Sequence, residues 1–164
     1  MPTSPVIEYR GGFDFNVTPG ELWFSLEHGE EYERWWPWLE DFSLDGGRLR
    51  SGAVMHGVVA PPLPYRMRLD LELVTCHRPT MIDALVHGDL KGNASLRIGR
   101  CGLDSCRVEA TWSVEMMQVP MRIASRFAHP LLRWGHDRVV ESTVRSFRRH
   151  LEATALRSGS SPRG

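Results

Sequence analysis

A long helical segment, residues 121–151, closes a chain whose other segments mostly have the patterns of strands. Before it come one strand, two short helical segments rich in tryptophan, and an unbroken succession of strands. A curved antiparallel sheet with a single helix across its concave side does not fill the space between them with side chains alone. The sequence therefore predicts an α+β fold in which about seven strands wrap around a long C-terminal helix and leave an internal cavity. Such a cavity favours a small hydrophobic ligand.

Local signals place the first elements of this fold. Apolar and polar residues alternate through residues 7–16 and predict the first strand, with Gly11-Gly12 as a bulge in it. Thr18-Pro19-Gly20-Glu21 predicts a helix start, because it combines a hydroxyl N-cap, a proline at the first helical position and a glutamate that can close a capping box. A second helical turn is expected over residues 30–35. The two short helices thus follow the first strand directly.

Six further strand-like runs follow, separated by proline- and glycine-containing connections. They cover residues 42–44, 53–60, 65–75, 81–87, 93–98 and 107–117. The short links predict an antiparallel meander. Tyr65, Leu69 and Leu71 alternate with charged residues along one run. Trp112 and Val114 do the same along another, so one face of the sheet is expected to meet water and the other to face the helix.

Length and charge limit the classes of partner. A chain of 164 residues is long enough for one domain with its own core. We assign that domain to residues 1–152 and a flexible C-terminal tail to 153–164. Lys and Arg balance Asp and Glu to a formal net charge of +0, which does not favour nucleic acid or an anionic membrane as a partner. No run approaches the ~20 apolar residues that cross a bilayer, and residues 1–6 lack the apolar part of a secretory signal. We expect a cytoplasmic monomer or homodimer without stable membrane insertion.

The three cysteines do not form a disulfide scaffold. Cys76, Cys101 and Cys106 are too few and odd in number for one. Cys101 and Cys106 flank a turn, so they either face each other across a hairpin or stay free thiols.

The C-terminal helix carries an apolar stripe that contains a histidine. The stripe is formed by Leu132, Val139, Val140, Thr143, Val144, Phe147 and Leu151. At ~100° per residue, His136 lies near the centre of this face. A buried imidazole needs hydrogen-bond partners, and beside a ligand it can act as an acid or a base. His136 is therefore either a structural histidine satisfied by a backbone carbonyl or a strand side chain, or a group that contacts the ligand. Pro130 predicts a break or kink near residues 128–129.

Further candidates lie on the strands and in the tryptophan-rich connection. His56 shares its alternation class with two valines and is expected to point inward, with a ligand or a structural partner. Tyr65 begins a strand and offers a hydroxyl at the cavity rim. In Trp35-Trp36-Pro37-Trp38, part is expected in the core and part over the cavity mouth. The expected ligand-binding residues are Trp35, Trp38, Leu69, Leu71, Trp112, Val114, Leu132 and His136, and the candidate catalytic residues are His136, Tyr65 and His56.

Motifs for several other chemistries are absent from the sequence. There is no HExxH, CxxC, P-loop or GxGxxG, and no serine lies in a GxSxG elbow. His129 and His136 are seven residues apart across a proline, which is poor spacing for a pair of metal ligands. We therefore expect no metal and no cofactor.

Five short motifs, in this order, carry a family resemblance. They are Thr18-Pro19-x-x-Leu22-Trp23, Tyr32-x-x-Trp35-Trp36-Pro37-Trp38, Pro62-Leu63-Pro64-Tyr65, Gly88-Asp89-Leu90-Lys91-Gly92 and His129-Pro130-Leu131-Leu132-Arg133-Trp134-Gly135-His136. Over residues 7–151 the chain resembles the START-like, helix-grip superfamily, in particular bacterial proteins of the polyketide cyclase/dehydrase and lipid-transport type. In the most similar branch the final helix has an Arg-Pro step and then an Asn-His pair, whose histidine matches His136. The resemblance therefore implies a functional role for His136. Because His129 precedes the proline here and Gly135 replaces the asparagine, it does not imply a polar relay through those two positions.

Two functions stay open, because the superfamily includes cyclases and aromatases, ligand carriers and quinone-binding proteins on one fold. As a binding module, the protein would hold a lipid, a quinone or a polyketide-like molecule between sheet and helix. As a polyketide cyclase/dehydrase, it would use His136 as general acid and base, with Tyr65 or His56. The sequence shows no clear acid and base pair, which favours binding. A protein that acts only on a partner surface is the third reading.

Overall fold

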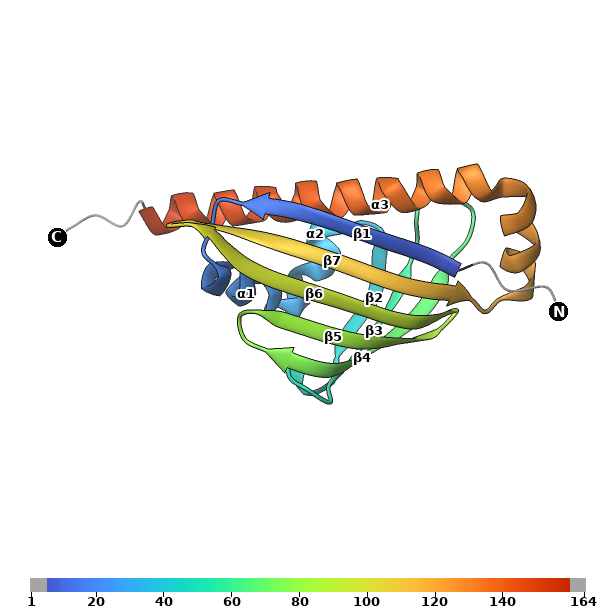
Figure 1. The fold of residues 1–164 in the computed structure, drawn as a ribbon, viewed down its shortest axis with the longest axis horizontal. Helices are drawn as coiled ribbons and strands as arrows, with labels where there is room; N and C mark the ends of the chain where they lie inside the picture. Colours follow the sequence, from blue (N-terminus) through green and yellow to red (C-terminus); the bar gives the residue numbers. More distant parts are fainter. Residues whose placement is uncertain (1–5, 160–164) are drawn as a thin grey trace.

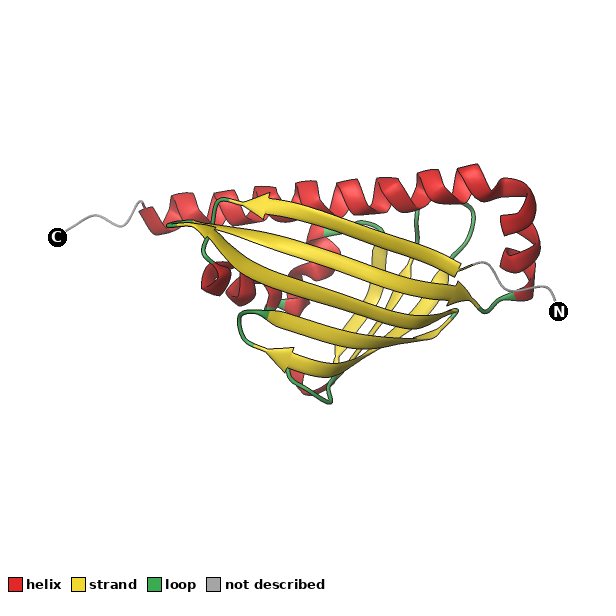
Figure 2. Cartoon of the chain, viewed as in Figure 1, coloured by secondary structure: helices red, strands yellow, loops and turns green. Residues whose placement is uncertain are grey.

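A single seven-stranded antiparallel sheet forms the body of the protein, with strand order β1-β7-β6-β5-β4-β3-β2. The computed structural model describes residues 6–159; for residues 119–129, 131, 132, 155, 158 and 159 it describes the backbone alone. Figure 1 and Figure 2 show the sheet curving beneath one long helix, α3. The elements are β1 (Val6–Phe15), α1 (Pro19–Leu26), η1 (Gly29–Glu31), α2 (Tyr32–Trp35), β2 (Leu39–Leu44), η2 (Asp45–Gly47), β3 (Val54–Val59), β4 (Met67–His77), β5 (Met81–Gly88), β6 (Leu90–Gly102), β7 (Ser105–Met116) and α3 (Val119–Gly159). The predicted α+β class, the seven strands and the helix-grip arrangement are confirmed.

The predicted start of α1 is confirmed in detail. The backbone N–H of Glu21 donates to Thr18 Oγ1 at 3.3 Å, and the backbone N–H of Thr18 donates to Glu21 Oε2 at 2.8 Å. These two bonds form a capping box, which satisfies donors that the first helical turn leaves free. Leu22 and Trp23 then point into the core and are 0% and 1% exposed.

The predicted bulge in β1 is wrong. Gly11 pairs with Ala110 and Gly12 with Glu109 in unbroken register between β1 and β7. Gly11 is needed for another reason: a Cβ at this position would lie 2.1 Å from the hydroxyl oxygen of Tyr9 and would clash with it. Tyr9 and Gly11 share a face of the strand, and the missing side chain leaves room for the tyrosine ring.

The C-terminal helix is longer than the sequence predicted. It runs without interruption from Val119 to Gly159, with Pro130 inside it, so the expected break is absent. Figure 1 shows α3 bending sharply in its orange, N-terminal part, which agrees with the kink that was predicted as the alternative to a break. Residues 153–159 were expected in a flexible tail and are helical, whereas residues 160–164 of that tail lie outside the described range.

Two of the three hydrophobic clusters in the described part of the chain lie at different positions along β7. The first joins α1, α2 and the C-terminal half of α3 to the sheet, with Trp23, Trp35, Val108, Phe147 and Leu151 among its members. The second lies on the sheet farther along β7, and its buried members are Val86, Leu90, Val114 and Met116. At ~3.4 Å per strand residue, Val108 and Val114 are about 20 Å apart. The short helices and the C-terminal half of α3 therefore pack on one end of the sheet, and a separate apolar cluster lies at the other.

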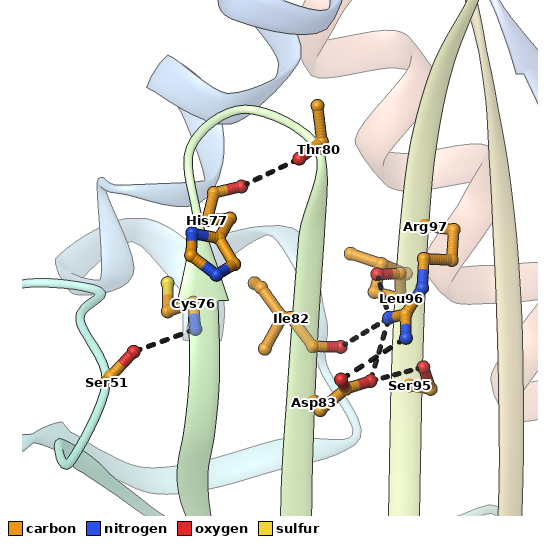
Figure 3. Close-up of polar contacts among 9 residues, drawn as sticks. All are labelled: Ser51, Cys76, His77, Thr80, Ile82, Asp83, Ser95, Leu96 and Arg97. Atoms are coloured by element: carbon orange, nitrogen blue, oxygen red, sulfur yellow. Dashed lines mark hydrogen bonds and ion pairs between the residues drawn. The ribbon is translucent and has the colours of Figure 1, made fainter.

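Polar contacts cover the outer face of the sheet. Asp83 on β5 accepts hydrogen bonds from Arg97 Nη1 at 2.7 Å and from Ser95 Oγ at 2.6 Å, both on β6 (Figure 3). These bonds lower the pKa of the Asp83 carboxyl, and the bond from Arg97 has the larger effect. The neighbouring Ala84 is buried on the opposite face. The sheet is therefore wet on one side and apolar on the other, as the alternation predicted.

Two further expectations concern thiols and membranes. Cys101 is exposed and Cys106 buried, and both are free thiols. Burial raises the pKa of Cys106 to about 11. Among the described residues, no helix has both the length and the apolar character that a bilayer span requires.

Candidate functional site

Three aromatic rings from distant parts of the chain meet where α3 crosses β1 and β7. Tyr9 on β1 pairs with Trp112 on β7, and their rings stack with centroids 4.2 Å apart. The imidazole of His136 on α3 lies against both, 5.2 Å from the Tyr9 ring and 5.3 Å from the Trp112 ring. The face of the helix that carries His136 therefore meets the apolar face of the sheet.

The two nitrogens of His136 have different surroundings. Nδ1 lies 3.3 Å from Asp137 Oδ1, on the exposed side of the helix. Nε2 is buried and has no hydrogen-bond partner within the described part of the chain. Since a carboxylate accepts only, this contact makes Nδ1 the donor in a neutral ring and leaves Nε2 as an acceptor. A buried acceptor without a partner loses the hydrogen bond it had with water, a loss that a ligand hydroxyl can reverse.

Tyr9 is a site residue that sequence reasoning missed. Burial, and secondarily the charge of Asp137, raise the pKa of its hydroxyl. The phenol is therefore protonated at neutral pH and can donate a hydrogen bond. Tyr9 alternates with polar residues in the first strand in the same way as Phe13 and Phe15. Its hydroxyl is the one sequence signal that could have distinguished it as a site residue.

Part of the predicted apolar lining, from β4 and β7, packs in one cluster with the Trp112 ring. Leu69, Leu71 and Tyr65 pack against the same cluster as Val114 and Trp112. All but Val114 remain partly exposed, although they lie on the apolar face of a curved sheet. Burial raises the pKa of the Tyr65 hydroxyl, so it too is a neutral donor. The side chain of Leu132 lies outside the described residues, and the enclosed cavity itself stays a prediction.

The connection between β3 and β4 covers this end of α3. A Cβ at Gly135 would lie 2.5 Å from Leu63 Cδ1, so Leu63 reaches the helix only because residue 135 is glycine. Gly135 is buried beneath it. The glycine that departs from the family pattern thus permits a close contact beside His136.

Part of the tryptophan-rich connection lies in the core, as expected, and the expectation that another part covers a cavity mouth stays a prediction. Trp35 is 7% exposed and belongs to the packed core. Trp36 Nε1 donates to the carbonyl of Thr143 on α3 at 3.2 Å. Trp38 lines a groove of about 340 Å³ between this connection, the start of the β3–β4 connection and α3, together with Pro37, Ala60, Pro62, Arg138, Val139, Glu141, Ser142 and Arg145. Trp38 Nε1 is buried and, among described residues, has no hydrogen-bond partner.

The prediction that His56 points inward is wrong. His56 pairs with Asp70 in the register of β3 and β4, and its Nδ1 lies 2.6 Å from Asp70 Oδ1 on the charged outer face. Its Nε2 lies 3.2 Å from Asp45 Oδ1. Met55, in the other alternation class of β3, packs against the core. His56 therefore lies on the face opposite the aromatic cluster and is removed from the candidate catalytic set.

His56 gives a testable pH dependence of stability. Hydrogen bonds to Asp70 and then Asp45 raise its pKa in the folded state. The stabilisation is then fully present below the unfolded pKa of ~6.5 and is lost as pH rises through the raised folded value. In urea unfolding, the free energy of unfolding of wild type should exceed that of His56→Gln by more at pH 5.5 than at pH 8.5. The change in this difference should be less than ~1 kcal/mol, because the pair is exposed. Asp70→Asn should shrink this difference, and an equal difference at both pH values would contradict it.

Comparisons with known proteins identify the fold. No family model matches the chain, and no curated protein matches it. Solved structures match over nearly all of it. A START superfamily protein from Mycobacterium smegmatis has 13% identity and a TM-score of 0.67, covering 90% of this chain and 98% of that one. The Zhui aromatase/cyclase from Streptomyces sp. R1128 has 11% identity and a TM-score of 0.67, with 90% and 94% covered. Norcoclaurine synthase from Thalictrum flavum, a point mutant in complex with a transition-state analogue, has 11% identity and a TM-score of 0.63, with 94% and 99% covered.

These similarities establish a START-like, helix-grip fold for this chain, as the sequence motifs implied. At such low identity the fold alone is shared, and the site must be argued from the residues of this chain.

Proposed function

We propose that the protein binds a small hydrophobic molecule bearing a hydroxyl group, between α3 and the apolar face of the sheet. The observation that carries the proposal is the buried, unpartnered Nε2 of His136 beside the rings of Tyr9 and Trp112. A planar or extended apolar ligand would lie against Trp112 and the leucines of β4. Its hydroxyl would donate to Nε2, and the Tyr9 hydroxyl could donate to a ligand carbonyl.

The fold supports this class of function. The solved structures that share it include a START superfamily protein, an aromatase/cyclase and a norcoclaurine synthase. Their TM-scores of 0.63 to 0.67 show that the fold is shared over most of the chain. The proposal therefore agrees with the fold and adds a particular group, the His136 imidazole, to the ligand contacts.

Binding should be saturable and should quench tryptophan emission. We expect neutral N-phenyl-1-naphthylamine and dodecan-1-ol to raise the melting temperature, because ligands that bind only the folded state stabilise it, by ~2.7 kcal/mol at 100 times Kd. The naphthylamine should also quench tryptophan emission, since Trp112 would contact it. Trp112→Ala should weaken the binding of both ligands, whereas Trp134→Ala, at an exposed residue of α3, should not. If neither ligand changes emission or melting temperature, the carrier function is contradicted.

A polyketide cyclase/dehydrase is the second candidate function. The contact between Nδ1 and Asp137 favours it, because it orients the ring and leaves Nε2 without a partner among the described residues, as a general base requires. Tyr9, whose ring lies 5.2 Å from the His136 ring, replaces His56 as a candidate partner of His136, and Tyr65 stays a candidate. Mass spectrometry of a poly-β-ketone thioester incubated with the protein would show loss of water if the chain turns it over. An unchanged substrate that nevertheless binds would support the carrier function.

A further inference from the structure

A second groove lies at the packed end of the molecule, away from the aromatic cluster. It has a volume of about 680 Å³ and runs between α1, the η1–α2 segment and the C-terminal half of α3. Figure 1 shows α1 at the same end as this half of the helix. The groove is lined by Phe24, Ser25, His28, Glu31, Arg34, Trp35, Ser146, Arg149, His150, Ala153, Thr154 and Arg157. At ~1.5 Å per helical residue, His150 is about 21 Å along α3 from His136, so this groove is distinct from the site proposed above.

The groove walls carry excess positive charge. Arg34, Arg149 and Arg157 line the groove and are exposed, and Glu31 is the single acidic residue among the lining residues. Throughout the described part of the chain, none of the three guanidinium groups has an ion pair, although several arginines elsewhere do, such as Arg97 with Asp83. Guanidinium groups form strong paired hydrogen bonds with carboxylates and phosphates. The groove is therefore complementary to an anion.

Aromatic rings line the same groove. The imidazole of His150 lies 4.0 Å from the Trp35 ring, with an interplanar angle of 33°. Trp35 is fixed by the core, and this tilted ring pair forms one wall of the groove. The His28 ring lies 4.7 Å from the ring of Phe24, which is 54% exposed at the groove. Burial, more than any neighbouring charge, lowers the pKa of His150, so its ring is neutral at pH 7 and offers an apolar face.

We propose that this groove binds a small aromatic anion, a planar ring that carries a carboxylate or a phosphate. The ring would lie against the Trp35–His150 wall, and the anionic group would be held by Arg34 and Arg149 from opposite sides of the groove. The volume is within the ~300–1,000 Å³ range typical of small-molecule sites. Neither a neutral lipid nor a cation would use the unpaired arginines.

Isothermal titration with four probes tests this proposal: 2-naphthoate, 2-naphthyl phosphate, neutral 2-methylnaphthalene and non-aromatic cyclohexanecarboxylate. We expect wild type to bind at least one of the two naphthyl anions, and the tighter of them identifies the preferred anionic group. Arg34→Gln/Arg149→Gln should weaken that binding at least tenfold. It should leave 2-methylnaphthalene unchanged, and cyclohexanecarboxylate should bind more weakly than 2-naphthoate.

The control removes the same charge elsewhere. Arg48→Gln/Arg68→Gln changes two exposed arginines outside the groove and should keep wild-type affinity for the anion. Melting temperatures of both double variants establish that they are folded, and Arg149→Gln alone repeats the test with a smaller change. If both double variants lost the same affinity for the naphthyl anion, the loss would be due to net charge alone and the proposal would be overturned. Loss of naphthoate binding in Trp112→Ala, but not in the groove variant, would place the anion in the other site and overturn it as well.

Discussion

Replacing Trp23 with alanine is expected to lower the free energy of unfolding by about 3–5 kcal/mol, the usual cost of removing a buried tryptophan. Trp23 is 1% exposed in the cluster that joins α1 to the sheet and to the C-terminal half of α3. Its Nε1 donates to Glu27 Oε1 at 2.9 Å, so the change also removes a partly buried hydrogen bond. Urea unfolding followed by circular dichroism would measure the loss.

Trp134→Ala is the matched control, because Trp134 is 45% exposed on α3. The guanidinium carbon of Arg138 lies over its ring, 5.6 Å from the ring centroid. Trp134→Ala should cost less than ~1 kcal/mol. The slope of the urea dependence should stay the same in both variants if each unfolds in a single transition. A loss below 1 kcal/mol for Trp23→Ala would contradict the assignment of Trp23 to the packed core.

Features encoded within a few residues of sequence could be predicted. The capping box at Thr18 needs only the residue three positions further on, and it forms as expected. The face of α3 on which His136 lies could be predicted from its helical spacing to Val139 and Val140. The C-terminal end of α3 could not be predicted in the same way. The apolar stripe stops at Leu151, whereas the helix continues to Gly159 through residues that do not break helices.

Features that depend on strand pairing could not be predicted. Alternation in β3 sorts the residues into two classes, but both classes contain apolar side chains, so it does not say which class faces inward. Pairing with β4 decides this, because His56 lies opposite Asp70. In the same way, the register of β1 against β7 places Tyr9 beside Trp112, and the packing of α3 on these strands places the His136 imidazole against both rings. The place of Tyr9 in the site could therefore be recognised only from the three-dimensional structure.

His136→Leu should keep the fold and weaken binding of hydroxyl-bearing ligands by about 1–3 kcal/mol, the value of a buried hydrogen bond to a ligand. Leucine suits the apolar face of α3, and among described residues the buried Nε2 has no protein partner that the change would strand. The melting temperature should therefore change little. The measurement compares 2-naphthol with 2-methylnaphthalene, which replaces the hydroxyl with a methyl group, by titration of wild type and variant.

Only 2-naphthol should lose affinity in His136→Leu, because 2-methylnaphthalene has no proton to donate to Nε2. His136→Gln is the matched variant, since its amide oxygen can accept a hydrogen bond, and it should recover part of the lost affinity. If His136 were structural, both ligands would keep their affinity for the folded protein while the melting temperature fell. An unchanged affinity for 2-naphthol together with an unchanged melting temperature would show that the unpartnered nitrogen has no role in either binding or stability.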